Sequence, residues 1–226
     1  MKIMGIDRLR METDGEGVTT LVVSAGCPLR CAFCLNPITW DGSFNGKDYS
    51  VEELYDALKI DNLYFLSTGG GVTFGGGEPL LHASFLREFI LKYKKVTGWK
   101  FDIESSLSVP RKNLEAVIDL IDYFYIDTKD MDKERYEKYT CGDYDLFSGN
   151  LSYLLEKRGS ECITVKVPKI PYFHKEKEWL ENVECLKKMG FDNIYLFDYI
   201  EPDKRKKVSD SYIAHKNKFL ENLKNE

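Results

Sequence analysis

The sequence lacks any apolar run long enough to cross a membrane. Hydrophobic residues make up 43% of its 226 positions, but no stretch approaches the roughly 20 consecutive apolar residues that a transmembrane helix needs. The first residues also lack the apolar core of a signal peptide. We therefore expect a cytoplasmic protein without a membrane partner.

The net charge is also small, and histidines are few. A net charge of −5 leaves no basic footprint for nucleic acid, and the basic run 204–207 is typical of a solvated loop. Two of the three histidines, His82 and His174, are expected to have surface or packing roles. Internal repeats, low-complexity segments and linkers are missing, so we predict a single domain over residues 1–226.

Cysteine is unevenly distributed along the chain. Three of the six cysteines, Cys27, Cys31 and Cys34, lie within eight residues. Disulfides are poor candidates in a cytosolic chain, because the thiol pools there keep cysteines reduced. Three unrelated thiols would have no reason to gather in this way, so the group indicates a site with its own chemistry.

Strand-like and helix-like segments alternate along the chain. Short, β-branched runs predict six strands, at residues 19–24, 72–74, 100–104, 123–126, 162–167 and 194–197. Amphipathic stretches between them predict helices, one beginning at a capping box of Ser50 and Glu53 and another over 114–121. This rhythm is typical of βα units with a parallel sheet. Six units are too few for a closed eight-stranded barrel, so we predict an α/β fold with a partial (β/α)6 TIM-like barrel.

The unusual polar residues follow the predicted strands. The clustered cysteines follow the first strand, and a glycine run ending in Glu78 follows the second. Glu104 and Ser105 end the third strand, Asp127 ends the fourth and Asp198 ends the sixth. In parallel βα folds the functional residues gather where strands end. We therefore expect these residues on one rim of the sheet.

The three clustered cysteines suit an iron–sulfur cluster better than zinc. A closed zinc site takes four ligands, usually as two separated pairs, whereas three thiolates can hold three corners of a cubane cluster. The fourth iron would then be open to a small molecule. A fourth ligand from Cys141, Cys162 or Cys185 is conceivable, but these are scattered, and we expect them to be buried packing residues.

The spacing Cys27-x3-Cys31-x2-Cys34, with Phe33 before the last cysteine, resembles the radical S-adenosylmethionine (SAM) superfamily. The resemblance implies a [4Fe–4S] cluster on these three cysteines, with an open iron that binds the amino and carboxylate groups of SAM. It also implies an oxidoreductase in which an electron from the reduced cluster cleaves SAM to a 5′-deoxyadenosyl radical. A non-catalytic metal-binding module is the alternative from another class, and it leaves the glycine run unexplained.

A second motif narrows the resemblance. The glycine-rich segment 69–79 is similar to the corresponding segment of the enzymes that activate glycyl radical enzymes. Glycine lets a backbone approach a ligand closely and expose its polar groups to it. In the family this stretch contacts the methionine amine, so the resemblance implies that Gly76, Gly77 and Glu78 bind SAM.

Further rim residues follow the same family. The additional cofactor-binding residues that the resemblance implies are Asn36, Glu104, Ser105, Asp127, Lys129 and Ile170. The carboxylates and hydroxyls would hold the methionine part of SAM and, as in some relatives, a monovalent cation beside it. Ile170 would pack on adenine. Ordinary ion pairs are the other interpretation of Glu104 and Asp127, and Ile200 after Tyr199 departs from the family's histidine near adenine.

The resemblance predicts an activase, which abstracts a hydrogen atom from a glycine of a partner glycyl radical enzyme. It implies an anaerobic, monomeric protein that receives electrons from a flavodoxin or a ferredoxin-type donor. No second cysteine-rich insert lies between Trp40 and Ser50, so we expect a minimal, single-cluster member. A radical SAM enzyme acting on a small molecule or a ribosomal peptide is the alternative.

Overall fold

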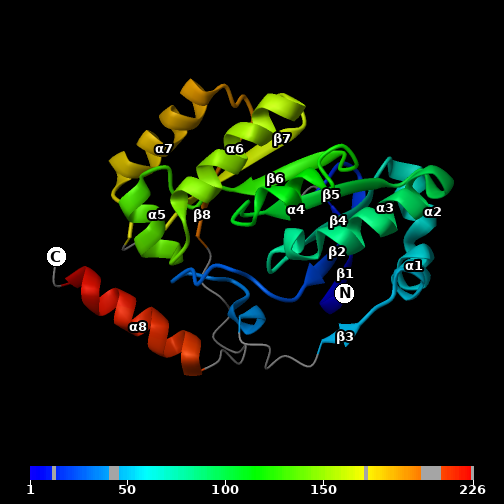
Figure 1. Ribbon diagram of the computed structural model, residues 1–226, viewed down its shortest axis with the longest axis horizontal. Helices are drawn as coiled ribbons and strands as arrows, with labels where there is room; N and C mark the ends of the chain where they lie inside the picture. Colours follow the sequence, from blue (N-terminus) through cyan, green and yellow to red (C-terminus); the bar gives the residue numbers. More distant parts are fainter. Residues whose placement is uncertain (12–13, 41–45, 171–172, 200–209, 225–226) are drawn as a thin grey trace.

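The structure is a computed structural model that describes residues 1–11, 14–40, 46–170, 173–199 and 210–224. Its strands form one open sheet in the order β3-β1-β2-β4-β5-β6-β7-β8, which Figure 1 shows with the helices around it. The strands are β1 Lys2–Met11, β2 Val18–Ser24, β3 Lys47–Asp48, β4 Gly71–Gly76, β5 Lys100–Ser105, β6 Tyr123–Asp127, β7 Ile163–Lys169 and β8 Ile194–Asp198.

Six strands of this sheet are parallel. Each neighbouring pair from β2 through β4 to β8 has parallel register, and at least one helix separates each of these strands from the next. The six strands are the ones predicted, with ends that agree to within two residues. The predicted α/β fold with six βα units is therefore confirmed.

The sequence pattern predicts neither β1 nor β3. β1 pairs antiparallel with β2, and β3 pairs antiparallel with β1. Along β1 only Ile3 is fully buried, and charged residues such as Arg8 and Arg10 interrupt the apolar alternation. β3 consists of two exposed residues. Both strands depend on pairing with a partner, which a local pattern cannot reveal.

Helices between the parallel strands cover the outer face of the sheet (Figure 1). They are α1 Val51–Leu58, α2 Asn62–Thr68, α3 Ala83–Thr97, α4 Arg111–Glu115, α5 Lys133–Thr140, α6 Tyr144–Arg158 and α7 Glu176–Met189, followed at the C-terminal end by α8 Asp210–Lys224. The predicted capping box begins α1: the Glu53 N–H donates to the Ser50 hydroxyl, and the Ser50 N–H donates to the Glu53 carboxylate. None of the described helices is long and apolar enough to span a bilayer.

The predicted helix over residues 114–121 is shorter in the structure. α4 ends at Glu115, and the chain continues in tight turns in which the Val117 N–H donates to the Leu114 carbonyl (3.1 Å). Leu114, Val117, Ile118 and Ile121 are nevertheless all buried. Turns with i+3 hydrogen bonds place apolar side chains on one side much as a helix does, so the burial was predicted correctly and the regular helix was not.

The two faces of the sheet differ in polarity because side chains alternate along each strand. On the outer face Phe74 of β4 packs edge-to-face on Phe89 of α3, with ring centroids 6.0 Å apart. The alternate positions of the central strands carry polar side chains, which define the inner face: Thr73, Asp102, Glu104, Tyr125, Asp127, Thr164 and Lys166. The inner face is therefore the one suited to a polar ligand.

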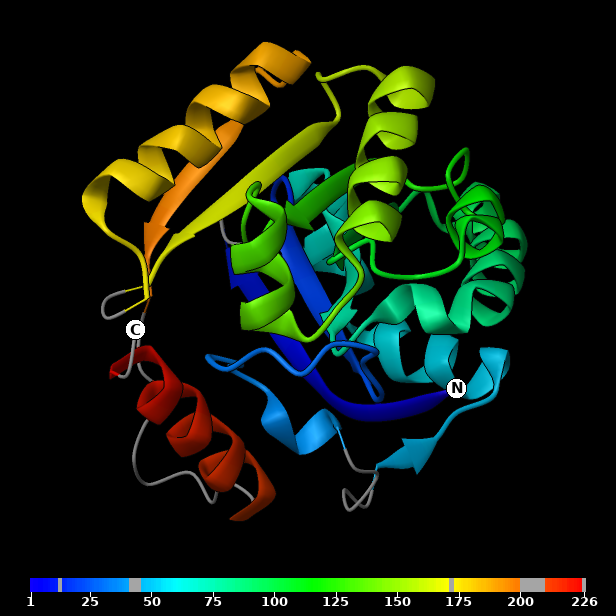
Figure 2. The ribbon, with the colours of Figure 1, turned by 60° about the vertical axis from the view of Figure 1, so that its left-hand side comes forward.

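A second apolar cluster surrounds the loop that follows β2. The ring of Phe33 contacts those of Tyr139 at the end of α5, Tyr199 after β8 and Phe219 of α8, at centroid distances of 6.0, 5.5 and 5.9 Å. Figure 2 shows α8 beside this loop. Ile170 is buried in the same cluster. Elements distant in sequence thus enclose the loop.

Asp102 is a buried acid on the inner face. Burial raises the pKa of Asp102 to about 7, with Asp122 contributing. Because this folded-state pKa lies above the unfolded one, the folded state keeps a proton that the unfolded state releases, and this contribution to stability is lost as the pH rises through about 7. We predict that the free energy of unfolding of the wild type, relative to that of Asp102→Asn, falls by about 1.4 kcal/mol per pH unit between about pH 5 and pH 7. Urea unfolding at a series of pH values measures this difference, and parallel pH profiles of the two proteins would contradict it.

Candidate functional site

The structure brings the three clustered cysteines together in the loop after β2, residues 27–34, which we call the cysteine loop. The Cys34 N–H donates to the Cys31 carbonyl (3.2 Å), which turns the loop back on itself. Ionisation of one thiol would disfavour ionisation of its neighbours. Cys31 is buried, and Cys27 and Cys34 are partly buried. The three cysteines therefore share one short, sheltered loop at the end of a strand.

The thiols are sheltered enough to resist ionisation. Burial raises the pKa of Cys27 to about 12 and also raises the pKa values of Cys31 and Cys34. The ammonium of Lys129 acts in the opposite direction on all three. Thiolates form in such surroundings when a positively charged group binds them, as an iron cluster does.

The end of α5 fixes the backbone of the cysteine loop. The Arg30 N–H donates to the Thr140 carbonyl (2.7 Å), and the Ala32 N–H donates to the Tyr139 carbonyl (3.0 Å). The guanidinium of Arg30 also donates to the Cys27 carbonyl (2.8 Å). These bonds hold the loop both to α5 and to itself, so the thiols have a defined arrangement.

The glycine run, residues 75–78 at the end of β4 and just after it, lies directly against the end of β2 and the residues that lead into the cysteine loop. The Gly77 N–H donates to the Ser24 carbonyl (3.0 Å), and the Glu78 N–H donates to the Gly26 carbonyl (2.8 Å). A side-chain carbon on Gly77 would lie 2.2 Å from the Gly26 oxygen. Gly76 has a φ of +96°, a conformation that side chains disfavour. Both glycines are therefore required by the backbone itself.

Asn36 joins the cysteine loop to the glycine run. Its N–H donates to the Cys34 sulfur (3.3 Å), and its side-chain amide donates to the Gly76 carbonyl (3.5 Å). Asn36 is exposed. The structure thus brings this residue beside the cysteines and the glycines with which the sequence associated it.

The Glu78 carboxylate is buried, with 0% of the residue exposed. It accepts hydrogen bonds from the hydroxyl groups of Ser105 (2.8 Å) and Ser106 (2.6 Å) and from the N–H groups of Ser106 (2.8 Å) and Leu80 (3.1 Å). Burial raises the pKa of Glu78, and these hydrogen bonds oppose that effect. Glu78 and Ser105 thus connect the glycine run to the end of β5. A direct contact of either side chain with a ligand stays a prediction.

Two of the predicted rim carboxylates, Asp127 and Glu104, lie beside ammonium groups. Asp127 is 2.9 Å from the Lys129 nitrogen, and Glu104 contacts the ammonium of Lys166. Burial favours the neutral form of Asp127, but Lys129 and Lys166 outweigh it and lower the pKa. Burial raises the pKa of Glu104 despite Lys166. A monovalent cation at Glu104 does not fit this arrangement, because an ammonium already contacts that carboxylate.

Ile170 follows β7 and is completely buried among Leu29, Phe33 and Tyr139. Its contact with adenine stays a prediction, since the described apolar cluster covers this side chain. The Tyr199 N–H donates to the Lys169 carbonyl (3.0 Å) near the same place. Ile200 and the run 204–207 lie outside the described residues.

The other three cysteines occupy different environments. Cys162 and Cys185 are partly buried and pack against the main core, which agrees with the predicted packing role. Cys141 is exposed, so its predicted burial is wrong. It follows the last residue of α5 in a left-handed conformation, with a φ of +54°, and such a helix-ending position leaves the side chain in solvent.

The donor set fits a cluster better than a single metal ion. Within the described ranges, no group of three or more histidine, cysteine or acidic side chains is arranged to hold one ion. The three thiols nevertheless share one short loop. Three thiolates are suitable ligands for three irons of a cubane cluster.

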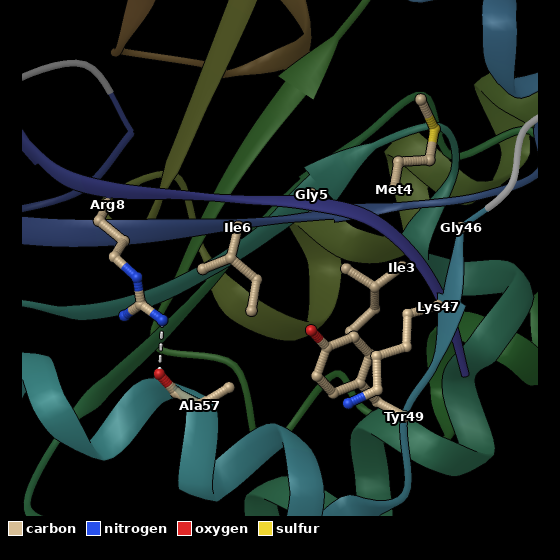
Figure 3. Close-up of a pocket in the computed structure, with 9 residues that line it drawn as sticks. All are labelled: Ile3, Met4, Gly5, Ile6, Arg8, Gly46, Lys47, Tyr49 and Ala57. Carbon is tan, nitrogen blue, oxygen red and sulfur yellow. Dashed lines mark hydrogen bonds between the residues drawn. The ribbon is translucent and has the colours of Figure 1, made fainter.

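A pocket of about 410 Å³ lies elsewhere, between β1, β3 and α1. Figure 3 shows Arg8 at its wall, where the guanidinium donates to the Ala57 carbonyl (2.6 Å). The same group donates to Asp61 (2.5 Å). Its described lining includes none of the predicted site residues, and the hydrogen bonds of Arg8 are already made within the protein.

A comparison with known protein families covers all of these features with one family model. The model of the Radical SAM superfamily matches residues 21–210, which include the cysteine loop, the glycine run and the inner face. The chain belongs to the radical SAM superfamily. Radical SAM proteins use a [4Fe–4S] cluster and SAM. The three thiols described above suit the cluster, and the glycine run suits SAM.

Radical SAM relatives with activating roles are similar to this chain. A pyruvate formate-lyase-activating enzyme of Clostridium pasteurianum is 40% identical over 124 residues, 55% of this chain and 51% of the relative. A 4-hydroxyphenylacetate decarboxylase activating enzyme of Clostridioides difficile is 29% identical, over 75% of this chain and 72% of the relative. The match with the first of them thus spans about half of that relative's length.

A solved radical SAM structure shares the fold. Streptococcus suis SuiB bound to S-adenosylmethionine aligns with a TM-score of 0.61 at 14% identity, over 89% of this chain and 46% of that one. At this identity the likeness concerns the fold, a partial TIM-like barrel. It therefore agrees with the predicted partial barrel.

Lys166 and Arg30 are residues of the candidate site that the sequence interpretation missed. Arg30 fixes the cysteine loop, and Lys166 neutralises Glu104. Lys166 stands between the buried Val165 and Val167 of β7. A cation between two buried residues of a strand is a signal for a position on the opposite face, because successive side chains point to opposite faces.

The close contact at Gly77 generates a stability prediction. Gly77→Ala should lower the free energy of unfolding by about 1–3 kcal/mol, since the added carbon would collide with the Gly26 carbonyl. Gly5→Ala is the matched control, because its added carbon meets nothing within 4 Å; it should change stability by no more than about 0.5 kcal/mol. Anaerobic urea unfolding measures both, and equal stability of the two variants would show that the loops tolerate separation.

The thiol assignment predicts two outcomes for cysteine replacements. Alanine at Cys27, Cys31 or Cys34 should remove a cluster ligand, lower the iron content and abolish SAM cleavage. Cys162→Ala, in the core, should retain the iron of the wild type. The measurements are the iron content per chain and the amount of 5′-deoxyadenosine, which is determined by chromatography. Loss of iron in Cys162→Ala would mean that the cluster ligands were assigned to the wrong cysteines.

Proposed function

We propose that this chain is an activating enzyme that installs a radical on a glycine of a partner glycyl radical enzyme. The observation that carries the proposal is the hydrogen-bonded junction of the glycine run with the end of β2, which leads into the cysteine loop, at the ends of strands whose inner face is polar. The activating roles named for the relatives from Clostridium pasteurianum and Clostridioides difficile support the same partner class. Residues 1–226 would act as a single radical SAM domain.

The cluster and SAM would be held by residues that the structure brings together. When bound, the reduced [4Fe–4S] cluster supplies the electron that cleaves SAM into methionine and a 5′-deoxyadenosyl radical. Cys27, Cys31 and Cys34 would hold three irons, leaving the fourth for the amino and carboxylate groups of SAM. The exposed backbone groups at 76–77 would hydrogen-bond the methionine amine of SAM. Asp127 and Lys129 would orient the charged methionine end, with both signs of charge available within 2.9 Å.

The apolar cluster would protect the reactive species. Phe33 lies between two of the cysteines and is covered by Tyr139 and Phe219. Excluding water from this side prevents side reactions of a radical and strengthens the electrostatic contacts inside. The protein's contribution is thus to orient SAM and to keep solvent away while the hydrogen atom moves.

The inner face is suited to a backbone segment of the partner. A glycine loop has no side chain to obstruct its approach, and its N–H and C=O groups need hydrogen-bond partners when buried. The hydrogen atom would pass from the glycine α-carbon to the 5′ carbon, giving 5′-deoxyadenosine and leaving a backbone radical on the partner.

We further propose the setting in which this reaction takes place. The electron would come from a flavodoxin or a ferredoxin-type donor, since the cluster must be reduced by one electron. The protein would work as a monomer in an anaerobic cytoplasm, meeting its partner transiently. Oxygen would destroy both an exposed cluster and a glycyl radical, which is the reason for the anaerobic expectation.

An electron paramagnetic resonance experiment tests the activase proposal. The cluster is reconstituted anaerobically and reduced, and SAM and a candidate glycyl radical enzyme are added. We expect a glycyl doublet on the partner together with 5′-deoxyadenosine. A partner with the target glycine replaced by alanine is the matched control and should give no doublet.

The products separate the alternatives. 5′-Deoxyadenosine without a glycyl doublet on any candidate partner would support a radical enzyme for a small molecule or a ribosomal peptide instead. A fully loaded cluster that yields no 5′-deoxyadenosine would contradict radical SAM chemistry in this chain. The Cys31→Ala variant sets the background for both products.

A further inference from the structure

Lys166 and Glu104 contact each other although a strand lies between theirs. Lys166 lies in β7 opposite Asp127 of β6, and its ammonium contacts the carboxylate of Glu104 in β5. Adjacent strands are about 4.8 Å apart, so both side chains must extend over β6 to meet. The ammonium lies over the ring of Tyr125, 5.3 Å from its centroid, and that ring supports it midway.

The contact between Lys166 and Glu104 is sheltered from solvent. Only 17% of the lysine side chain and 22% of the glutamate side chain are exposed. Burial by itself lowers the pKa of Lys166, but Glu104 and Asp127 outweigh this effect and raise it. The amine is therefore charged at neutral pH, and its attraction to Glu104 is stronger than that of a pair in open water.

The charges on this part of the inner face already balance. The two carboxylates, Glu104 and Asp127, face two ammoniums, Lys129 and Lys166. Lys129 lies 2.9 Å from Asp127, and Lys166 is the ammonium that contacts Glu104. A monovalent metal ion at Glu104 would share one carboxylate with an ammonium, and two cations at such a distance repel each other.

We propose that the Lys166 ammonium replaces the monovalent cation that the family resemblance implies beside the methionine end of SAM, so that this chain binds SAM without Na⁺ or K⁺. The inference rests on the proposed SAM site. Lys166 keeps a positive charge at a fixed place because its backbone belongs to a central strand and its ammonium lies on Tyr125. It is a positioning residue, acting through Glu104 and the local charge.

The salt dependence of SAM binding tests this proposal. Protein with its reconstituted cluster is dialysed anaerobically against SAM in a buffer whose only cation is choline, and then with K⁺ or Na⁺ at the same ionic strength. The wild type should bind SAM equally well in all three buffers. Lys166→Met should lose at least about tenfold in affinity in choline, the size of a lost charge-assisted contact, and regain most of it with K⁺ or Na⁺.

Lys169→Met is the matched control. Lys169 ends the same strand and pairs with Asp198 (2.6 Å), away from Glu104, so its replacement should leave the salt response of the wild type unchanged. Wild-type affinity that rises several-fold with K⁺ or Na⁺ would overturn the proposal. So would a Lys166→Met variant that binds SAM as the wild type does, with no response to either ion.

A second readout does not depend on SAM. Thallium nuclear magnetic resonance reports binding of a monovalent ion directly: Lys166→Met should show a saturable site that the wild type lacks, while iron content and circular dichroism confirm that both are folded. Absence of that site in the variant would contradict the replacement. If no variant binds SAM at any salt composition, the proposed function fails together with this inference, whereas salt-dependent binding by the wild type removes the inference alone.

Discussion

The close contact between the glycine run and the end of β2 is the constraint on which the whole site depends. Two backbone hydrogen bonds, from Gly77 to Ser24 and from Glu78 to Gly26, join the ends of two neighbouring parallel strands. Since β2 leads directly into the cysteine loop, these bonds fix the thiols relative to the glycine backbone. A residue with a side chain at Gly77 would separate the loops. The site is therefore built by backbone approach before any side chain contributes.

The buried carboxylate of Glu78 extends this junction to the next strand. A buried charge is costly unless donors surround it, and Glu78 receives four hydrogen bonds, chiefly from Ser105 and Ser106 at the end of β5. The cysteine loop, the glycine run and the end of β5 are thus bonded in series. Ser105, which the sequence associated with SAM, has a structural partner in Glu78. The rim thus gains rigidity from a polar group that a sequence pattern alone would assign to a ligand.

The sequence predicted what is encoded locally. The six parallel strands follow from β-branched runs, and the thiol group follows from spacing, because both depend on neighbours in the chain. β1 and β3 were not predicted because they form by pairing with other strands rather than from a local pattern. The regular helix predicted over 114–121 was wrong because turns bury the same apolar residues. The bond from Arg30 to the Cys27 carbonyl and the contact of Lys166 with Glu104 join side chains to groups that only the folded sheet brings within reach.

The alternation of side chains explains why the charges of the site can vary while the fold stays the same. In β5, Phe101 and Ile103 point to the core, whereas Asp102 and Glu104 point to the inner face. The core sets the position of the backbone, so an inner-face residue changes the local charge without changing the strand. Lys166 uses this freedom: its neighbours in β7 keep the sheet packed, and its side chain brings a positive charge to Glu104. A single inward-facing position therefore sets the local charge of this part of the inner face.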